Sequence, residues 1–182
     1  MSRRCAPNVN SGSMADIAFL LLIFFLITTT IASEKGIKRQ LPMLCPNPAE
    51  CLQRIEERNL IRITVNSNSE LMVNGESLGI GELKNLLIAF IDNNGSEKCS
   101  YCEGESVLDS SEHPSKAYIS LVVDSKTKYS FYILLQDEIT KAYKELRLRY
   151  ALNTFKKRPE NLNRLELKQT KNAYPFHLVE VN

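Results

Sequence analysis

The strongest constraint on this sequence is an apolar run near its N-terminus. Every residue from Ile17 to Ile27 is apolar, and Asp16 is the only charged residue between Met14 and Ala32. An α-helix rises about 1.5 Å per residue, and about 20 residues cross the hydrocarbon core of a bilayer. The sequence therefore predicts a transmembrane helix over residues 14–33, preceded by a polar tail over residues 1–13.

A cleaved secretory signal peptide is the alternative to this helix. Arg3 and Arg4 form a basic n-region, and Thr30-Ile31-Ala32 offers small residues for cleavage. An acidic residue beside the apolar core is unusual in a signal peptide, which favours a retained helix. In both interpretations Arg3 and Arg4 hold the short tail in the cytoplasm and the C-terminal part is exported.

Export would place four cysteines in an oxidising compartment, where they could form two disulfides: Cys45, Cys51, Cys99 and Cys102. The Cys99-Ser-Tyr-Cys102 spacing matches a redox CxxC, but it falls in a polar loop and not at a helix start after a strand. Structural disulfides are therefore favoured, with the pairing open. Zinc binding stays the weaker alternative because the Cys45 to Cys51 spacing is long for a zinc knuckle.

The exported part is predicted to have an α+β fold over residues 61–182, joined to the membrane helix by a linker over residues 34–60. Ile61, Ile63 and Val65 alternate with polar residues, as in a strand with one buried face, and residues 71–73 can pair with it. Asn74-Gly75 predicts a tight turn, followed by a helix over residues 81–92.

The second half of this domain begins with an inserted loop over residues 93–116, rich in Gly, Ser, Asp and Glu. A continuous apolar strand over residues 117–124 is expected at the centre of the sheet. A long amphipathic helix over residues 130–157, a polar segment over 160–172 and a short strand over 177–181 complete the chain. The strands should pack against two helices.

Composition and motifs exclude several functions. Lys and Arg number 23 against 21 Asp and Glu, and the basic residues are scattered along the sequence, which argues against a nucleic-acid partner. No Gly-rich phosphate loop occurs. His113 and His177 have no Ser or Cys arrangement typical of a triad and are expected at the surface. Neither an enzyme nor a cofactor or metal site is predicted.

The segment NSGSMADIAFLLLIFFLITT, from Asn10 to Thr29, resembles the N-terminal signature of the ExbD/TolR family of biopolymer transport proteins. Asn10 precedes Asp16 by six residues, and the apolar run holds paired leucines and phenylalanines. The family's strand, hairpin partner, helix, strand and helix agree with the elements expected over residues 61–143. Ser11-Gly12-Ser13, where the family often has Pro, and the cysteine-bearing loop are departures.

The resemblance implies a proton-motive-force-dependent subunit of an ExbB-ExbD-TonB-like motor in the bacterial inner membrane, with Asp16 as the proton carrier. Thr30, fourteen residues further on, could help hydrate the proton path. One helix with one acid cannot form a closed path in lipid. An ExbB/TolQ-like channel subunit, a TonB- or TolA-like coupling protein and a homodimer are the implied partners.

Partner contacts are expected at Asn10 and at the extended segment around Leu41 and Pro42. Two alternatives remain open. Asp16 could be only a first-turn residue favoured by the helix macrodipole. The chain could also be an exported or membrane-tethered binding domain with no role in carrying protons.

Overall fold

The computed structural model describes residues 10–28 and 55–181. It divides into two compact units, Met1–Asn47 and Pro48–Asn182, which are considered separately. Some predicted site residues lie outside the described residues: Thr30, Leu41, Pro42, Cys45 and Cys51.

The described part of the first unit is one helix, α1, Ser11–Thr28. It begins three residues before the predicted start because Asn10 caps it: the Asn10 Oδ1 accepts a hydrogen bond from the backbone N–H of Gly12 at 3.0 Å. Gly and Ser are weak helix formers, so the sequence at Ser11-Gly12-Ser13 favoured a later start. The Asn cap overrides that preference.

The second unit contains one five-stranded sheet in the order β3-β2-β1-β4-β5. Its strands are β1 Leu60–Val65, β2 Leu71–Val73, β3 Glu76–Ser77, β4 Tyr118–Val123 and β5 Leu178–Val181. β1 is antiparallel to β2 and parallel to β4, and β4 is parallel to β5. The internal position of β4 confirms the expectation of a central strand.

The predicted turn at Asn74-Gly75 connects β2 to β3. Both residues have positive φ angles, 50° at Asn74 and 89° at Gly75, as a tight hairpin turn requires. The two-residue strand β3 was not predicted, because two polar residues carry no period-two pattern.

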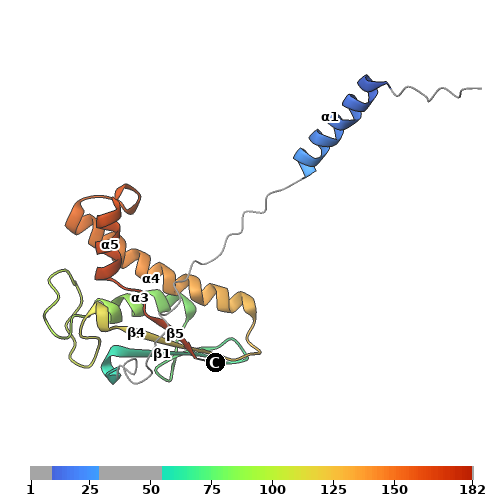
Figure 1. Cartoon of the computed structure of the whole chain (residues 1–182). Helices are drawn as coiled ribbons and strands as arrows, with labels where there is room; N and C mark the ends of the chain where they lie inside the picture. The colour runs from blue at the N-terminus through green and yellow to red at the C-terminus, as the bar shows by residue number, and fades with distance from the viewer. Residues whose placement is uncertain (1–9, 29–54, 182) are drawn as a thin grey trace, which may run out of the picture. The chain divides into compact units, whose positions relative to one another are not determined.

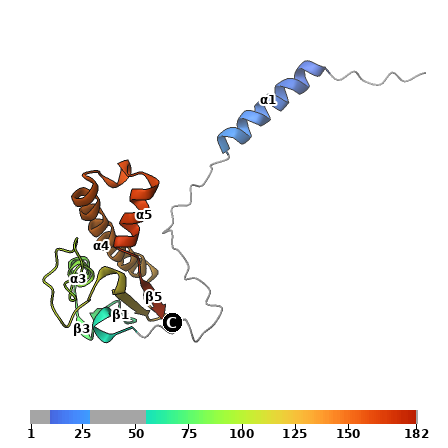
Figure 2. The ribbon, with the colours of Figure 1, turned by 60° about the vertical axis from the view of Figure 1, so that its left-hand side comes forward.

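Over residues 55–181, the described part of the domain has three α-helices: α3 Ile80–Ile91, α4 Tyr129–Phe155 and α5 Arg164–Ala173. Three short 3-10 helices accompany them, η1 Glu57–Asn59, η2 Pro114–Lys116 and η3 Pro159–Asn161. Figure 1 shows α3 and α4 on the same side of the sheet. In Figure 2, α5 lies alongside the C-terminal half of α4.

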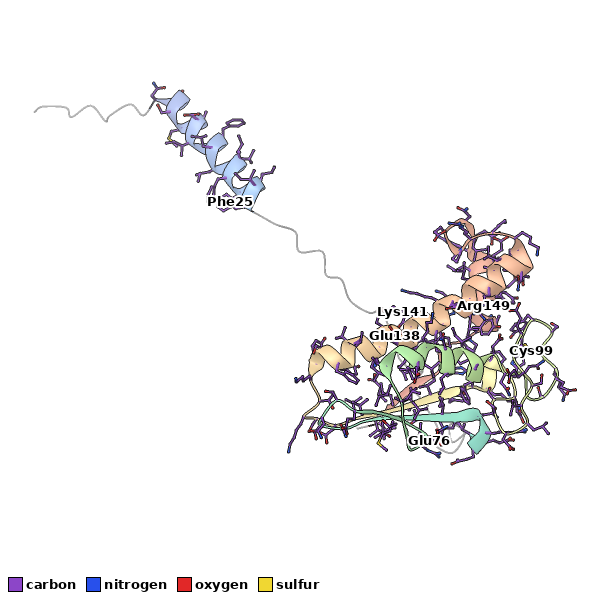
Figure 3. The ribbon with its side chains drawn as sticks, turned by 180° about the vertical axis from the view of Figure 1, so that it is seen from behind. Phe25, Glu76, Cys99, Glu138, Lys141 and Arg149 are labelled. Atoms are coloured by element: carbon purple, nitrogen blue, oxygen red, sulfur yellow. A yellow bond between two sulfur atoms is a disulfide. The ribbon has the colours of Figure 1, made fainter. Side chains whose placement is uncertain are left out.

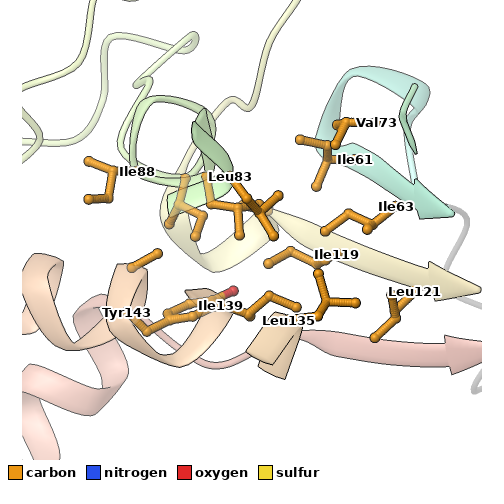
Figure 4. Packing of buried hydrophobic residues seen from close by; sticks show 14 of the residues in the cluster. Ile61, Ile63, Val73, Leu83, Ile88, Ile119, Leu121, Leu135, Ile139 and Tyr143 are labelled. Atoms are coloured by element: carbon orange, nitrogen blue, oxygen red, sulfur yellow. The ribbon is translucent and has the colours of Figure 1, made fainter. Parts of the chain in front are cut away.

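The core fills the space between one face of the sheet and the helices α3 and α4 (Figure 4). Alternate residues of β1 are buried, and Arg62 and Thr64 between them are exposed, which confirms the period-two prediction. The central core side chains are less than 2% exposed, among them Ile63, Leu83, Leu87, Ile119, Leu135 and Tyr143. The opposite face of the sheet is not covered by a described helix.

Candidate functional site

Asp16 lies in the second turn of α1 and not at its end. The helix begins at Ser11, so Asp16 stands about 7.5 Å further along the axis at 1.5 Å per residue. The unpaired backbone N–H groups of a helix belong to its first four residues, and the first turn of α1 holds no acidic residue. A first-turn position for Asp16 is therefore wrong, and the macrodipole offers it little stabilisation.

The side chains of α1 are exposed on every face of the helix, within the part of the chain that the structure describes. Large apolar residues such as Phe19, Leu22 and Leu26 are 58%, 63% and 73% exposed. α1 is long and apolar enough to cross a membrane, a test that a signal sequence would also pass. A helix that is apolar all round requires lipid or other helices around it.

Two polar side chains at the ends of α1 bond to its own backbone. Asn10 caps the N-terminus, so it has a local structural role, and its partner-binding role stays a prediction. The Thr28 hydroxyl donates to the carbonyl of Phe24 at 2.7 Å. Such bonding within the helix is the usual behaviour of a membrane threonine.

The structure joins Cys99 to Cys102 in a disulfide, with 5.5 Å between their Cα atoms. Cys99 is buried, and Figure 3 shows it in a loop at the same end of the domain as Arg149 of α4. No group of three or more His, Cys, Asp or Glu residues that could hold a metal ion occurs among the described residues. The disulfide closes a four-residue turn around Tyr101.

Tyr101 inserts into an aromatic cluster with Tyr150, near the end of α4, and Tyr174, which directly follows α5. Its ring makes edge-to-face contacts with Tyr174 and Tyr150, at centroid distances of 5.5 Å and 5.1 Å, and its hydroxyl donates to the carbonyl of Ala173 at 2.9 Å. Burial raises the pKa of Tyr101 to about 12. The disulfide loop is therefore a fixed part of the domain.

Asp92, at the C-terminus of α3, joins this loop to the rest of the fold. Its carboxylate accepts hydrogen bonds from the Tyr174 hydroxyl at 2.6 Å and from the backbone N–H of Glu103 at 3.2 Å. The side chain is almost fully buried, and this burial raises the pKa of Asp92. The neighbouring Asn93 bonds to both the N–H and the carbonyl of Val107.

No clear sequence pattern predicts this cluster. The predicted helix over residues 81–92 ends at Asp92 and the predicted loop begins at Asn93, and neither pattern indicates that these side chains are buried. The one available signal was Tyr101 itself, a large aromatic residue between two cysteines of a polar loop, since buried aromatic residues dominate packing energy.

The two histidines expected at the surface are only partly exposed. His113 and His177 are half-buried: the His113 ring contacts Tyr101, and the His177 ring stacks on Tyr118 at 4.5 Å between centroids. Burial lowers the pKa of both imidazoles. Each imidazole ring packs against a tyrosine that is distant in sequence, so these contacts could not be predicted from the sequence.

One apolar N-terminal helix and a small α+β domain define the class of protein. The family model described as "ExbD: Biopolymer transport protein ExbD/TolR" matches residues 2–174, and the chain belongs to this family. This range extends over α1 and most of the α+β domain. A comparison with curated proteins gives no match.

Family membership establishes a general role in biopolymer transport, in a family of non-enzymatic transport components. Members of the family generally work with ExbB/TolQ and TonB/TolA partners. Together with the apolar helix α1, membership supports membrane anchoring of the chain.

Proposed function

We propose that the chain is the proton-carrying subunit of an ExbB-ExbD-TonB-like motor, driven by the proton motive force and serving outer-membrane transport. The observation that carries the proposal is a single carboxylate, Asp16, within the second turn of an otherwise apolar helix matched by the family model. A carboxyl group can be charged or neutral, so its proton occupancy can act as a switch.

The energies involved are comparable. A charged side chain at the bilayer centre costs about 2.5 to 3.5 kcal/mol on insertion scales. One elementary charge crossing 100 mV gains about 2.3 kcal/mol. A membrane potential can therefore bias whether a carboxylate such as Asp16 holds its proton.

The motor requires partners around α1. The exposed apolar surface of this helix fits the interior of an ExbB/TolQ-like channel, with two copies of the chain forming an inner pair. Asn10 would face this channel subunit, and Thr30 would line the proton path. The chain would lie in the inner membrane with its tail in the cytoplasm and its α+β domain in the periplasm.

The domain outside the membrane would transmit the motion to a TonB- or TolA-like coupling protein. The segment around Leu41 and Pro42 is the proposed contact, because an extended segment can pair with a partner strand. Crosslinking from Leu41 that captures no coupling protein would remove this part of the proposal.

The decisive experiment compares transport in cells carrying Asp16→Asn and Asp16→Glu at matched membrane levels of the protein. Asn keeps the approximate shape of the side chain but cannot release a proton, so transport should stop while the complex still assembles. Glu keeps the titratable group, so it should retain more transport than Asn. Undiminished transport with Asn would contradict the proposal.

The second candidate function is an exported binding domain that carries no protons, and the described α+β domain, with its own core, is compatible with it. N-terminal sequencing of the mature chain separates the two. A mature chain starting near Ser33 would lack Asp16 and would exclude the motor.

A further inference from the structure

Positive charge gathers at one end of the domain. Residues 156–171, from the end of α4 through η3 and α5, contain six Lys and Arg residues and two Glu, a net charge of +4 in a chain whose total is +2. We call this segment the basic tip. Figures 1 and 2 both show the turn between α4 and α5 at the end of the domain farthest from the sheet.

Most of these cations have no acidic partner among residues 10–28 and 55–181. Lys157 pairs with Glu166 at 2.7 Å. The others are exposed and form no ion pair with the residues that the structure describes: Lys156, Arg158, Arg164, Lys168 and Lys171. Elsewhere in the described domain, Lys141 and Arg149 contact carboxylates, whereas Lys98, Lys126 and Lys128 form no ion pair with described residues. The basic tip differs in gathering five such cations within 16 residues. The basic tip therefore has a positive charge that its own fold leaves uncompensated.

The helix α5 presents three of these five cations on one face. Arg164, Lys168 and Lys171 follow one another at steps of four and three residues, so they share a face, and the buried Thr170 and Ala173 lie on the opposite side. A capping box holds the start of the helix, with Asn163 and Glu166 bonding to each other's backbone N–H at 2.8 Å. The basic face is thus fixed in place.

Two exposed leucines flank this basic face. Leu165 is 66% exposed and Leu167 is 39% exposed, and their positions in the helical turn place them on either side of Arg164 and Lys168. A helix with a basic face and adjoining exposed apolar residues is typical of an element that lies in a membrane interface. An anionic polysaccharide could also bind the basic face, but it would make no apolar contact with the two leucines.

Anchoring of the chain by α1 also limits how far the domain can move from the membrane. The 26 residues 29–54 connect α1 to the described part of the domain, and 26 residues reach at most about 90 Å. A tether of that length keeps the effective concentration of the membrane surface high, so weak contacts suffice for binding.

We propose that the basic tip docks on the anionic phospholipid surface of the membrane that anchors the chain, with Arg164, Lys168 and Lys171 contacting phosphate groups and Leu165 entering the interface. The proposal rests on anchoring by α1 and not on proton transfer by Asp16. An Asp16→Asn chain should therefore dock as the unaltered chain does, which keeps the two proposals separable.

The test uses the full chain reconstituted into lipid vesicles. The sequence contains no tryptophan, so Leu165→Trp introduces a single tryptophan at the proposed contact while keeping the side chain largely apolar, and its emission can be excited separately from that of the seven tyrosines. In vesicles that combine phosphatidylcholine with phosphatidylglycerol, its emission should shift to the blue and be quenched by brominated acyl chains. Both effects should be lost in phosphatidylcholine alone and reduced at high salt.

Charge variants of the Leu165→Trp chain test whether the basic face of α5 makes the contact with lipid. Replacing Arg164, Lys168 and Lys171 by Gln should abolish the blue shift and the quenching. A matched control replaces three exposed lysines outside the tip by Gln, giving the same net charge, and should retain both effects: Lys98, Lys126 and Lys128.

Three outcomes would overturn the proposal. The first is the same tryptophan emission in anionic and neutral vesicles. The second is the same loss of blue shift and quenching in the control variant as in the tip variant. The third is binding of the tip to isolated cell-wall polysaccharide with no response to anionic lipid. The last result would assign the basic tip to a polymer and not to the membrane.

Discussion

The hydroxyl of Tyr174 donates a 2.6 Å hydrogen bond to the carboxylate of Asp92, across 82 residues of sequence. The same tyrosine's carbonyl accepts two hydrogen bonds from the guanidinium of Arg147, at 3.0 and 2.7 Å. Tyr174 thereby connects the end of α3, the middle of α4 and the start of the segment leading to β5. Removing the side chain of Asp92 or of Arg147 leaves a buried polar group of Tyr174 without its hydrogen bond.

The buried Asp92 should make the stability of the domain depend on pH. Burial raises the pKa of Asp92 in the folded state above the ordinary aspartate value of 3.8, so the charged form destabilises the fold. This cost is absent below pH 3.8 and develops as the pH rises through the raised pKa. The free energy of unfolding of the wild type, relative to Asp92→Asn, should therefore rise on acidification from pH 7.

Thermal unfolding of the full chain in detergent at a series of pH values measures this difference. Tyr174→Phe provides a second test, because its hydrogen bond lowers the pKa of Asp92 and removing it should move the transition to higher pH. A difference between wild type and Asp92→Asn that does not change with pH would contradict the assignment.

Two variants of Tyr101 separate its hydrogen bond from its ring. Tyr101→Phe removes only the hydroxyl bond to Ala173 and should lower the free energy of unfolding by about 1 kcal/mol. Tyr101→Ala also removes the ring contacts with Tyr150 and Tyr174 and should cost about 3 kcal/mol. Urea unfolding of both variants gives the two values, and equal losses would show that the ring does not stabilise the fold.

Two glycine-to-alanine substitutions should have opposite effects. A Cβ at Gly104 would lie 2.3 Å from the carbonyl oxygen of Asp92 and 2.6 Å from the Cα of Asn93, so Gly104→Ala should cost about 1 to 3 kcal/mol. At Gly81, in α3, a Cβ meets nothing within 4 Å, and Gly81→Ala should stabilise by about 0.5 to 1 kcal/mol. The melting temperature of each variant shows whether the substitution stabilises or destabilises the domain. An unchanged melting temperature in Gly104→Ala would show that the loop around residue 104 can shift to accommodate the methyl group.

Reduction of the Cys99–Cys102 disulfide should destabilise the domain by about 2 kcal/mol, the entropy of closing a four-residue loop at 25 °C. Dithiothreitol should lower the melting temperature of the wild type. The Cys99→Ser, Cys102→Ser double variant should start at the lower value and not respond through this bond. A double variant as stable as the oxidised wild type would show that the disulfide adds nothing to the fold.

Local patterns predicted the elements with strong periodicity. Ile61, Ile63 and Val65 predicted β1 because a strand buried on one face must alternate, and Asn74-Gly75 predicted a turn because both residues accept positive φ. The apolar run starting at Ile17 predicted α1. In each case the physical cause lies within a few residues of sequence.

Features that depend on distant residues were not predicted. The loop over residues 93–116 was expected as an insertion, but its packing depends on Tyr150 and Tyr174, which are far along the chain. The basic residues of α5 look scattered in sequence, and they form a surface only when the helix and its turn from α4 bring them together. The early start of α1 is a miss of another kind, because its cause, the cap by the adjacent Asn10, is local.

The parallel pairing of β4 with β5 has a consequence for biosynthesis. Ile119 of β4 is opposite Leu178 of β5, and β5 is the last described strand. A chain made from its N-terminus therefore cannot complete the sheet until residues 178–181 have been synthesised and have reached the compartment where the domain folds. Until then one edge of β4 remains unpaired, so a stalled nascent chain would present a strand edge to which other chains can add.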